Sequence, residues 1–294
     1  MKLIDGKSIS LTVLDECKSM VTQITRVIKR SPKLIVYRVG DHTASIIYTE
    51  TKQKAGQKIG VDVEIKIILL EKNQDDLIGM IERDNMDDDI DGIIVQLPLP
   101  PGWNVHQIIN TIDPKKDVDG LTDWNMGRLA SGKCLLRPCT PRGVVCLLKR
   151  IQPNLKGLDA LVVGKSSIVG KPMALELLSL GCTVTIAHKA TKNLKQKVEG
   201  ADLVVSATGN PNVIDPQWFK PSSIVIDVGI SRNDKGGIRG DIDHQLCNQV
   251  SYITPVPGGV GPMTVAMLLR NVILACVHRT DAINILDLTS EDFT

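Results

Sequence analysis

One segment, residues 160–188, constrains the fold of this chain more than any other. Its sequence, ALVVGKSSIVGKPMALELLSLGCTVTIAH, begins with a short apolar run and ends with a β-branched run. Between the two runs lie a glycine-bounded turn, a proline suited to a first helical turn, good helix formers and a glycine suited to a helix C-terminus. This order predicts a strand, a helix and a second, parallel strand. The helix N-terminus of such a unit can bind a nucleotide pyrophosphate.

The turn from Gly164 to Gly170 matches no standard nucleotide-binding motif closely. Ser166 and Val169 stand where a GxGxxG motif would have its second and third glycines. In a P-loop the lysine after the last glycine is followed by Ser or Thr, and here a proline follows it. The turn alone therefore leaves open both a dinucleotide site and a plain βαβ element.

Strand-like and helix-like segments alternate along most of the chain. The predicted helices cover residues 8–29, 43–59, 77–84, 144–150, 173–180 and 263–277. The predicted strands cover residues 34–39, 61–70, 92–97, 160–163, 183–187, 203–207, 224–228 and 252–254. Residues 113–143 lack clean periodicity and are predicted to form loops around an inter-domain cleft. Alternation of this kind is typical of a parallel α/β fold, and 294 residues are enough for two domains.

The composition excludes several classes of protein. A formal net charge of +2 is too small to indicate a nucleic-acid partner. Seven cysteines form no CxxC pair, their odd number argues against a disulfide framework, and no signal peptide is recognised, so we expect a cytoplasmic protein. The apolar segment 263–277 is too short for a membrane span and is predicted to be a core helix.

The polar patterns indicate no metal and two solvated segments. The five histidines have no metal-ligand spacing, so no metal site is expected. The acidic run at residues 87–89 is interpreted as a solvated helix end or loop, and the residues after His278 are expected to fray.

A few polar residues could carry chemistry. Tyr48 and Lys52 are spaced i, i+4 and so share one face of a helix, although ordinary surface pairs have the same spacing. A lysine moved into an apolar cleft has a lowered pKa and can act as a general acid or base. Gln96 stands in the apolar run GIIVQLPLP, where a buried amide needs hydrogen-bond partners. The alternation of Asp117 and Asp119 turns one carboxylate to the cleft and the other to solvent, unless the pair only forms an Asp-Gly turn.

Eight segments together resemble the bifunctional methylenetetrahydrofolate dehydrogenase/methenyltetrahydrofolate cyclohydrolase family. They occur in the family's order along nearly the whole chain, which makes them far more specific than any single motif. The segments are ASIIYTETKQKA (44–55), VQLPLP (95–100), KDVDG (116–120), PCTPRGV (138–144), GKSSIVGKPMA (164–174), ATGNP (207–211), DVGI (227–230) and PVPGGVGPMT (255–264). The chain length resembles the family's short form, which lacks a formate-ligase domain.

The resemblance implies two α/β domains with the folate in a cleft between them. The N-terminal catalytic domain would comprise residues 1–139, with the C-terminal segment 265–294 packing back on it. Residues 140–264 would form a Rossmann-like domain that binds the dinucleotide. The reaction would be oxidation of 5,10-methylenetetrahydrofolate to the methenyl form and its hydrolysis to 10-formyltetrahydrofolate, in one-carbon metabolism and purine biosynthesis.

The resemblance also implies site residues. Tyr48 would stack on the folate, Lys52 would be the acid/base of cyclohydrolysis, Gln96 would hold its ammonium, and Asp119 would bind the pterin. Further substrate contacts would come from Val95, Leu97, Pro257, Gly258, Gly259, Val260 and Gly261. The cofactor would be held by Gly164, Lys165, Ser166, Val169, His188, Lys189, Thr208, Gly209 and Ile230.

The end of the second strand favours NADP. An NAD site has an acid there to bind the ribose 2′-hydroxyl, whereas here no acid occurs before Glu199. Lys165, His188 and Lys189 would instead meet a 2′-phosphate. The family commonly has Arg in place of Lys165, and a lysine lacks the bidentate fork of Arg, so the preference is expected to be weaker.

Two alternative functions explain fewer of these motifs, or require them in a different order. In a short-chain dehydrogenase the YxxxK pair follows the nucleotide motif, whereas here it precedes that motif by over a hundred residues. Another two-domain hydroxy-acid or amino-acid dehydrogenase leaves VQLPLP and KDVDG unexplained. An inactive folate- or nucleotide-binding module is also compatible with the sequence. The expected partners are tetrahydrofolate substrates and a second copy of the chain in a homodimer, with neither nucleic acid nor membrane.

Overall fold

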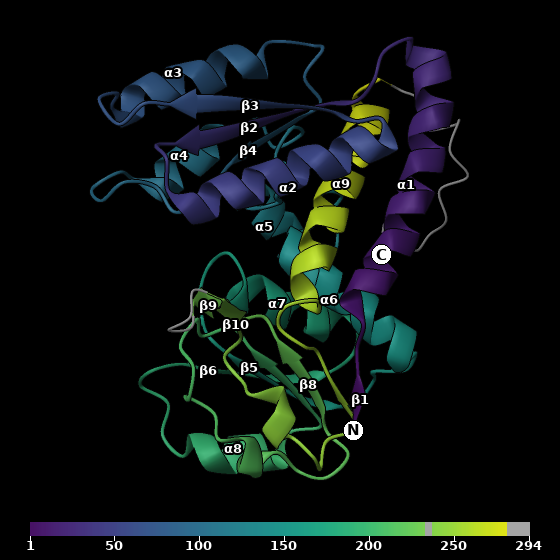
Figure 1. Cartoon of the computed structure of the whole chain (residues 1–294), viewed down its shortest axis with the longest axis vertical. Coiled ribbons are helices and arrows are strands. Elements are labelled where there is room, and N and C mark those ends of the chain that lie inside the picture. The colour runs from purple at the N-terminus through teal and green to yellow at the C-terminus, as the bar shows by residue number, and fades with distance from the viewer. Residues whose placement is uncertain (233–236, 281–294) are drawn as a thin grey trace. The chain divides into compact units, whose positions relative to one another are not determined.

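The computed structural model describes residues 1–232 and 237–280, which form two compact units (Figure 1). One comprises residues 1–11 and 140–264 and is called here the six-stranded unit. The other comprises residues 12–139 and the described residues from 265 on, and is called the three-stranded unit. Residues 1–11 thus cluster with residues 140–264, whereas the sequence analysis placed them with residues 12–139.

The three-stranded unit is built on a parallel sheet with the order β3-β2-β4. Its strands are β2 (Lys33–Val39), β3 (Asp62–Ile68) and β4 (Gly92–Val95). Its helices are α2 (Thr43–Ile59), α3 (Gln74–Asn85), α4 (Val105–Thr111), α5 (Asp123–Ala130) and most of α1 (Gly6–Ile28) and α9 (Val260–Arg279). Figure 1 shows α2 and α3 on opposite faces of this sheet.

Alternation along β2 explains how both faces of the three-stranded sheet are covered. Ile35, Tyr37 and Val39 point into one apolar core, which α3 and α4 complete with Leu77 and Ile108. The intervening residues of β2 point to the opposite face, where α2 packs. Burial on both faces is the usual condition of a parallel sheet.

The six-stranded unit is built on a fully parallel sheet with the order β1-β11-β8-β7-β5-β6. Its strands are β1 (Lys2–Leu3), β5 (Asp159–Val163), β6 (Thr183–Ala187), β7 (Leu203–Ser206), β8 (Ile224–Asp227) and β11 (Tyr252–Ile253). Its helices are α6 (Cys139–Ile151), α7 (Gly170–Ser179) and α8 (Leu194–Gly200), with short 3-10 helices at Pro216–Trp218 and His244–Leu246. A small antiparallel pair, β9 (Ser231–Arg232) and β10 (Ile238–Arg239), lies outside the main sheet.

Most of the predicted elements are confirmed, and two of them to the residue: the helix 43–59 and the strand 183–187. Gly60 ends α2 in the left-handed region at φ +88°, a conformation that glycine adopts without strain. The helix α9 is long and apolar enough to cross a membrane, but most of that stretch is buried within the fold. The expectation of a core helix is therefore confirmed.

Several short elements were missed by the sequence prediction. The segment predicted as loops, residues 113–143, contains α5, and α6 begins at Cys139 rather than at residue 144. The helices α4 and α8 were also missed, since seven residues are too few to show a helical period. The two-residue strand β1 forms only because it pairs with β11, a partner about 250 residues away.

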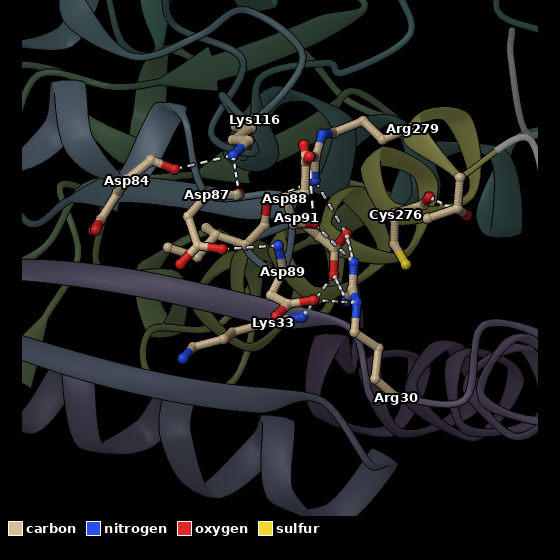
Figure 2. Close-up of polar contacts among 12 residues, drawn as sticks. Arg30, Lys33, Asp84, Asp87, Asp88, Asp89, Asp91, Lys116, Cys276 and Arg279 are labelled. Atoms are coloured by element: carbon tan, nitrogen blue, oxygen red, sulfur yellow. Dashed lines mark hydrogen bonds and ion pairs between the residues drawn. The ribbon is translucent and has the colours of Figure 1, made fainter.

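The acidic loop that joins α3 to β4 is exposed at residues 87–89, as predicted, and also contacts basic side chains of the same unit (Figure 2). The buried Lys116 ammonium donates to the carbonyl oxygens of Asp84, at 2.9 Å, and Asp87, at 2.5 Å. Arg30 and Arg279 both pair with the buried carboxylate of Asp91. These contacts fix the loop that precedes β4 and the segment that follows Lys116. The tail predicted to fray lies outside the described residues from residue 281 on.

Candidate functional site

In the three-stranded unit, the structure brings Lys52 and Gln96 together. Lys52 lies on α2, and its ammonium donates to Gln96 Oε1 at 2.8 Å. Gln96 directly follows β4, and its own amide donates to the carbonyl of Leu97 at 2.7 Å. The Gln96 side chain is thus oriented with its oxygen toward the lysine. Tyr48 lies one turn before Lys52 on the same helix and is half-buried.

The electrostatic surroundings of Lys52 favour proton transfer. Burial lowers the pKa of Lys52, and the nearby charges of Asp119 and Cys139 oppose part of that change. Burial raises the pKa of Asp119, which the ammonium partly offsets. Burial is the main cause that raises the pKa of the Cys139 thiol well above its ordinary value, and the nearby Asp119 raises it further. A lysine with a lowered pKa beside an amide oxygen and a carboxylate is suited to general acid–base chemistry.

The alternation of Asp117 and Asp119 predicted that one of the two carboxylates faces solvent, and Asp117 does not. Its carboxylate is buried and accepts hydrogen bonds from the backbone N–H groups of Gly120, at 3.0 Å, and Thr122, at 2.8 Å. The side-chain amide of Asn125 donates to the same carboxylate at 2.9 Å. Asp117 therefore has a structural role, holding the turn that carries Asp119. The prediction was wrong because the turn recruits this carboxylate as its internal acceptor.

Asn271 was missed by the sequence analysis. It lies on α9, is buried, and its side-chain amide donates to the carbonyls of Val118 and Arg137, both at 2.8 Å. The Cys139 thiol donates to the same Val118 carbonyl at 3.2 Å. Asn271 thereby ties the segment that carries Asp119 to the segment that carries Cys139. No local pattern marks this residue, since it is one polar position in an apolar helix.

In the six-stranded unit, the turn from Gly164 to Gly170 is too tight for side chains at its ends. A Cβ on Gly164, at φ +131°, would lie 2.3 Å from the carbonyl oxygen of Ala207. A Cβ on Gly170 would lie 2.1 Å from the carbonyl oxygen of Gly164. The Ser166 hydroxyl accepts from the N–H groups of Val169 and Gly170, both at 3.2 Å. The turn thus leads directly into α7, with Lys165 and Ser166 exposed.

The other predicted cofactor residues lie at the same edge of this sheet. His188 and Lys189 follow β6 and are exposed, Thr208 and Gly209 follow β7, and Ile230 comes after β8. Ligands of open α/β sheets bind outside the carboxyl ends of the strands. A glycine-walled turn, two exposed lysines and no acid after β6 fit a dinucleotide that carries an extra phosphate.

Of the segment predicted to wall the substrate, residues 257–259 lie in the connection between β11 and α9, and Val260 and Gly261 begin α9. The carbonyl of Gly258 accepts from the N–H of Lys7 at 2.9 Å, and Gly259 packs against Gly6. Two surface pockets of about 160 and 340 Å³ in the six-stranded unit contain none of the predicted site residues. Within residues 1–232 and 237–280, no group of three or more acidic, His or Cys side chains could hold a metal ion.

A glycine-walled turn at the carboxyl edge of a parallel sheet and, in the other unit, a half-buried lysine–amide pair are features expected of a two-domain dinucleotide-dependent dehydrogenase. Comparison with protein-family models identifies the family. Residues 4–119 match the catalytic domain of tetrahydrofolate dehydrogenase/cyclohydrolase, and residues 138–280 match the NAD(P)-binding domain of the same family. The chain belongs to the tetrahydrofolate dehydrogenase/cyclohydrolase family, and it is an enzyme with both activities.

Solved structures of this family agree with the assignment. The bifunctional methylenetetrahydrofolate dehydrogenase/cyclohydrolase of Campylobacter jejuni is 40% identical, with a TM-score of 0.91 over 95% of this chain and 99% of that chain. A methylenetetrahydrofolate dehydrogenase of the silkworm Bombyx mori is 33% identical, with a TM-score of 0.89 over 96% and 99%. The Trypanosoma brucei dehydrogenase–cyclohydrolase, solved with NADP and an inhibitor, is 32% identical, with a TM-score of 0.90 over 95% and 98%. This membership excludes the short-chain dehydrogenase reading.

Proposed function

We propose that this enzyme uses NADP to oxidise 5,10-methylenetetrahydrofolate and then hydrolyses the methenyl product at a site centred on Lys52. The hydrogen bond between the Lys52 ammonium and Gln96 Oε1 carries the proposal, together with the lowered pKa of Lys52. The two features give one side chain a fixed direction and a proton that it can release. Bound NADP supplies the hydride acceptor, and the chain's own residues do the rest.

We assign each residue of the site a role in this reaction. Lys52 moves the proton of the water adduct at the bridge carbon during hydrolysis. Gln96 holds the Lys52 nitrogen in place and adjusts its pKa. Tyr48 presents its ring, one helical turn away, as a surface on which the folate stacks. The Asp119 carboxylate accepts the paired N–H groups of the pterin ring, a geometry that suits two parallel donors.

The substitution Lys52→Met tests the role of the lysine. It keeps the length of the apolar side chain but removes the amine, so cyclohydrolase activity should be abolished while NADP binding persists. Lys54→Met is the matched control, because Lys54 lies on the same helix with an exposed side chain that only pairs with Glu50. Full cyclohydrolase activity in Lys52→Met, measured by the disappearance of methenyltetrahydrofolate, would refute the assignment.

The preference for NADP rests on Lys165 and Lys189, which are exposed at the sheet edge where the ribose is expected. Replacing both lysines with Ala should lower kcat/KM for NADP while leaving that for NAD nearly unchanged. Lys195→Ala is the control, because Lys195 pairs with Glu199 on α8. Equal catalytic efficiency of the unmodified enzyme with NAD and NADP would contradict the proposed preference.

We further propose a cytoplasmic homodimer that supplies one-carbon units for purine biosynthesis. The resemblance to the family supports the dimer. The absence of disulfides among the seven cysteines, all of which the structure describes, fits a reducing compartment. Sedimentation equilibrium of the purified chain tests the dimer, and a monomer at micromolar concentration would contradict it.

A further inference from the structure

A buried carboxylate, that of Asp241, lies behind the loop that follows β7. Its Oδ2 accepts three hydrogen bonds, each 2.8 Å long, from the Ser206 hydroxyl, the Thr208 N–H and the Thr208 hydroxyl. Asp241 is only 4% exposed. Charge-assisted hydrogen bonds of this kind are about twice as strong as neutral ones. One side chain, distant in sequence, therefore sets the conformation of the β7 loop.

A second buried carboxylate, that of Asp227, connects this arrangement to the end of β8. Its Oδ1 accepts from the N–H groups of Gly229, at 2.9 Å, and Asp241, at 3.1 Å. Its Oδ2 accepts from the N–H of Ile242 at 2.9 Å. Asp227 thus holds the backbone at 241–242, and Asp241 in turn holds the β7 loop. We call this pair of carboxylates the carboxylate brace.

The carboxylate brace leaves no space for other side chains. A Cβ on Gly229 would lie 2.0 Å from Asp241 Oδ1, and a Cβ on Gly240 would lie 2.0 Å from Asp227 Oδ2. Asp241 Oδ1 is itself buried and has no hydrogen-bond partner among residues 1–232 and 237–280. Burying two carboxylates side by side is unfavourable compared with an apolar pair of similar volume. Stability alone therefore does not explain why the fold has an acid at position 241.

The loops that the carboxylate brace holds explain the acid at position 241 better than stability does. The loop fixed by Asp241 carries Thr208 and Gly209, and the loop fixed by Asp227 leads to Ile230. These are residues that the family resemblance assigns to the cofactor site. We propose that Asp241 is a positioning residue for the dinucleotide site, holding the β7 loop in the conformation that binds NADP. The proposal rests on the proposed function, since it assumes that the dinucleotide contacts these loops.

The test compares Asp241→Ala, Asp241→Asn and the control Asp243→Ala in the full-length enzyme. Asp243 is exposed and lies two residues away, and its side chain accepts from the N–H of the nearby Gln245 at 3.0 Å. The dissociation constant for NADP is measured by calorimetry, KM is measured separately for NADP and methylenetetrahydrofolate, and cyclohydrolase activity is measured without NADP.

Asp241→Ala should weaken NADP binding by about tenfold or more, because three donors lose a charged acceptor. Asp241→Asn should weaken it less, since the amide oxygen can still accept but carries no charge. KM for the folate, cyclohydrolase activity and the Asp243→Ala control should all stay close to the unmodified enzyme. Weaker NADP binding with unchanged folate KM and cyclohydrolase activity would distinguish positioning of the cofactor loops from a general loss of structure.

An NADP dissociation constant within twofold of the unmodified enzyme in both Asp241 variants would overturn the proposal. A parallel loss of cyclohydrolase activity would also overturn it, because the role would then be structural. If Asp241→Ala does not fold, Asp241→Asn decides alone, and unchanged NADP binding in that variant is the contrary result. An unmodified enzyme that binds NAD but not NADP would refute the cofactor preference only, and the same ratios measured with NAD would still test Asp241.

Discussion

The substitution Gln96→Glu tests whether the side chain at position 96 sets the pKa of Lys52. It places a carboxylate where the Lys52 ammonium now finds an amide oxygen at 2.8 Å. Two unit charges at that distance attract by about 6 kcal/mol at an effective dielectric constant of about 20. Part of this attraction is lost to desolvation of the added carboxylate. The charged form of Lys52 is nevertheless favoured, which counteracts the lowering of its pKa by burial.

The assay is cyclohydrolase kcat/KM as a function of pH. The inflection that reports Lys52 should move upward by about one to three pH units in Gln96→Glu, the usual effect of an opposite charge at close range. Gln96→Met should move it downward, because the charged amine loses its hydrogen-bond acceptor while burial is retained. The upward direction holds whether the lysine acts as acid or base, since both limbs follow its pKa.

The matched control is Gln57→Glu, which adds the same charge at an exposed position of α2, the helix that carries Lys52. Water and salt screen this charge, so the inflection should stay within a few tenths of a pH unit of the unmodified enzyme. An inflection that does not move in Gln96→Glu, or that moves in the same direction in Gln96→Met, would refute the reasoning. Lys52 would then not be the group that titrates.

Two further predictions concern the segments that hold Asp119. Lys116→Met should reduce the free energy of unfolding in urea by about 2–5 kcal/mol, because a buried carbonyl, that of Asp84, and a partly buried one, that of Asp87, lose a donor. Substitution of the exposed neighbour, Lys115→Met, should change it by about 0.5 kcal/mol or less. Equal effects in the two variants would contradict this reasoning. Asn271→Leu should raise KM for the folate severalfold and leave the NADP dissociation constant unchanged, because it frees the segment that carries Asp119. An equal loss in NADP binding would show that the effect is general.

The fold was predictable wherever local chemistry sets the ends of an element. Gly60 ends α2 and Gly181 follows the end of α7, both at positive φ, so the sequence marks these boundaries directly. The strands of both sheets, apart from the two-residue β1, are short apolar runs that can be found from their residue types alone. The short helices were missed, and their only local signals were the N-cap residues, such as Asn104 before α4 and Thr122 before α5.

The candidate site also combines features that the sequence predicted with features that it did not. Lys52 and Gln96 could be selected from the chain, because a lysine on a helix face and an amide in an apolar run are each conspicuous. The two residues are 44 positions apart in the sequence, and only the packing of α2 near the end of β4 brings their side chains into contact. Asp117 shows the opposite case, because its alternation with Asp119 suggested exposure, whereas the turn uses its carboxylate as an internal acceptor.

The sequence by itself determined the parallel α/β class and the tight turn at Gly164, and it singled out Lys52 as the candidate acid–base group. Periodicity, glycine and proline act within a few residues, so their consequences can be followed along the chain. Tertiary structure alone decided which distant groups support the site: Asn271 bonds a carbonyl 153 positions away, and Asp241 bonds a hydroxyl 35 positions away. The physical reason is burial. A polar group removed from water must find a partner, and only the folded chain determines which partner lies within reach.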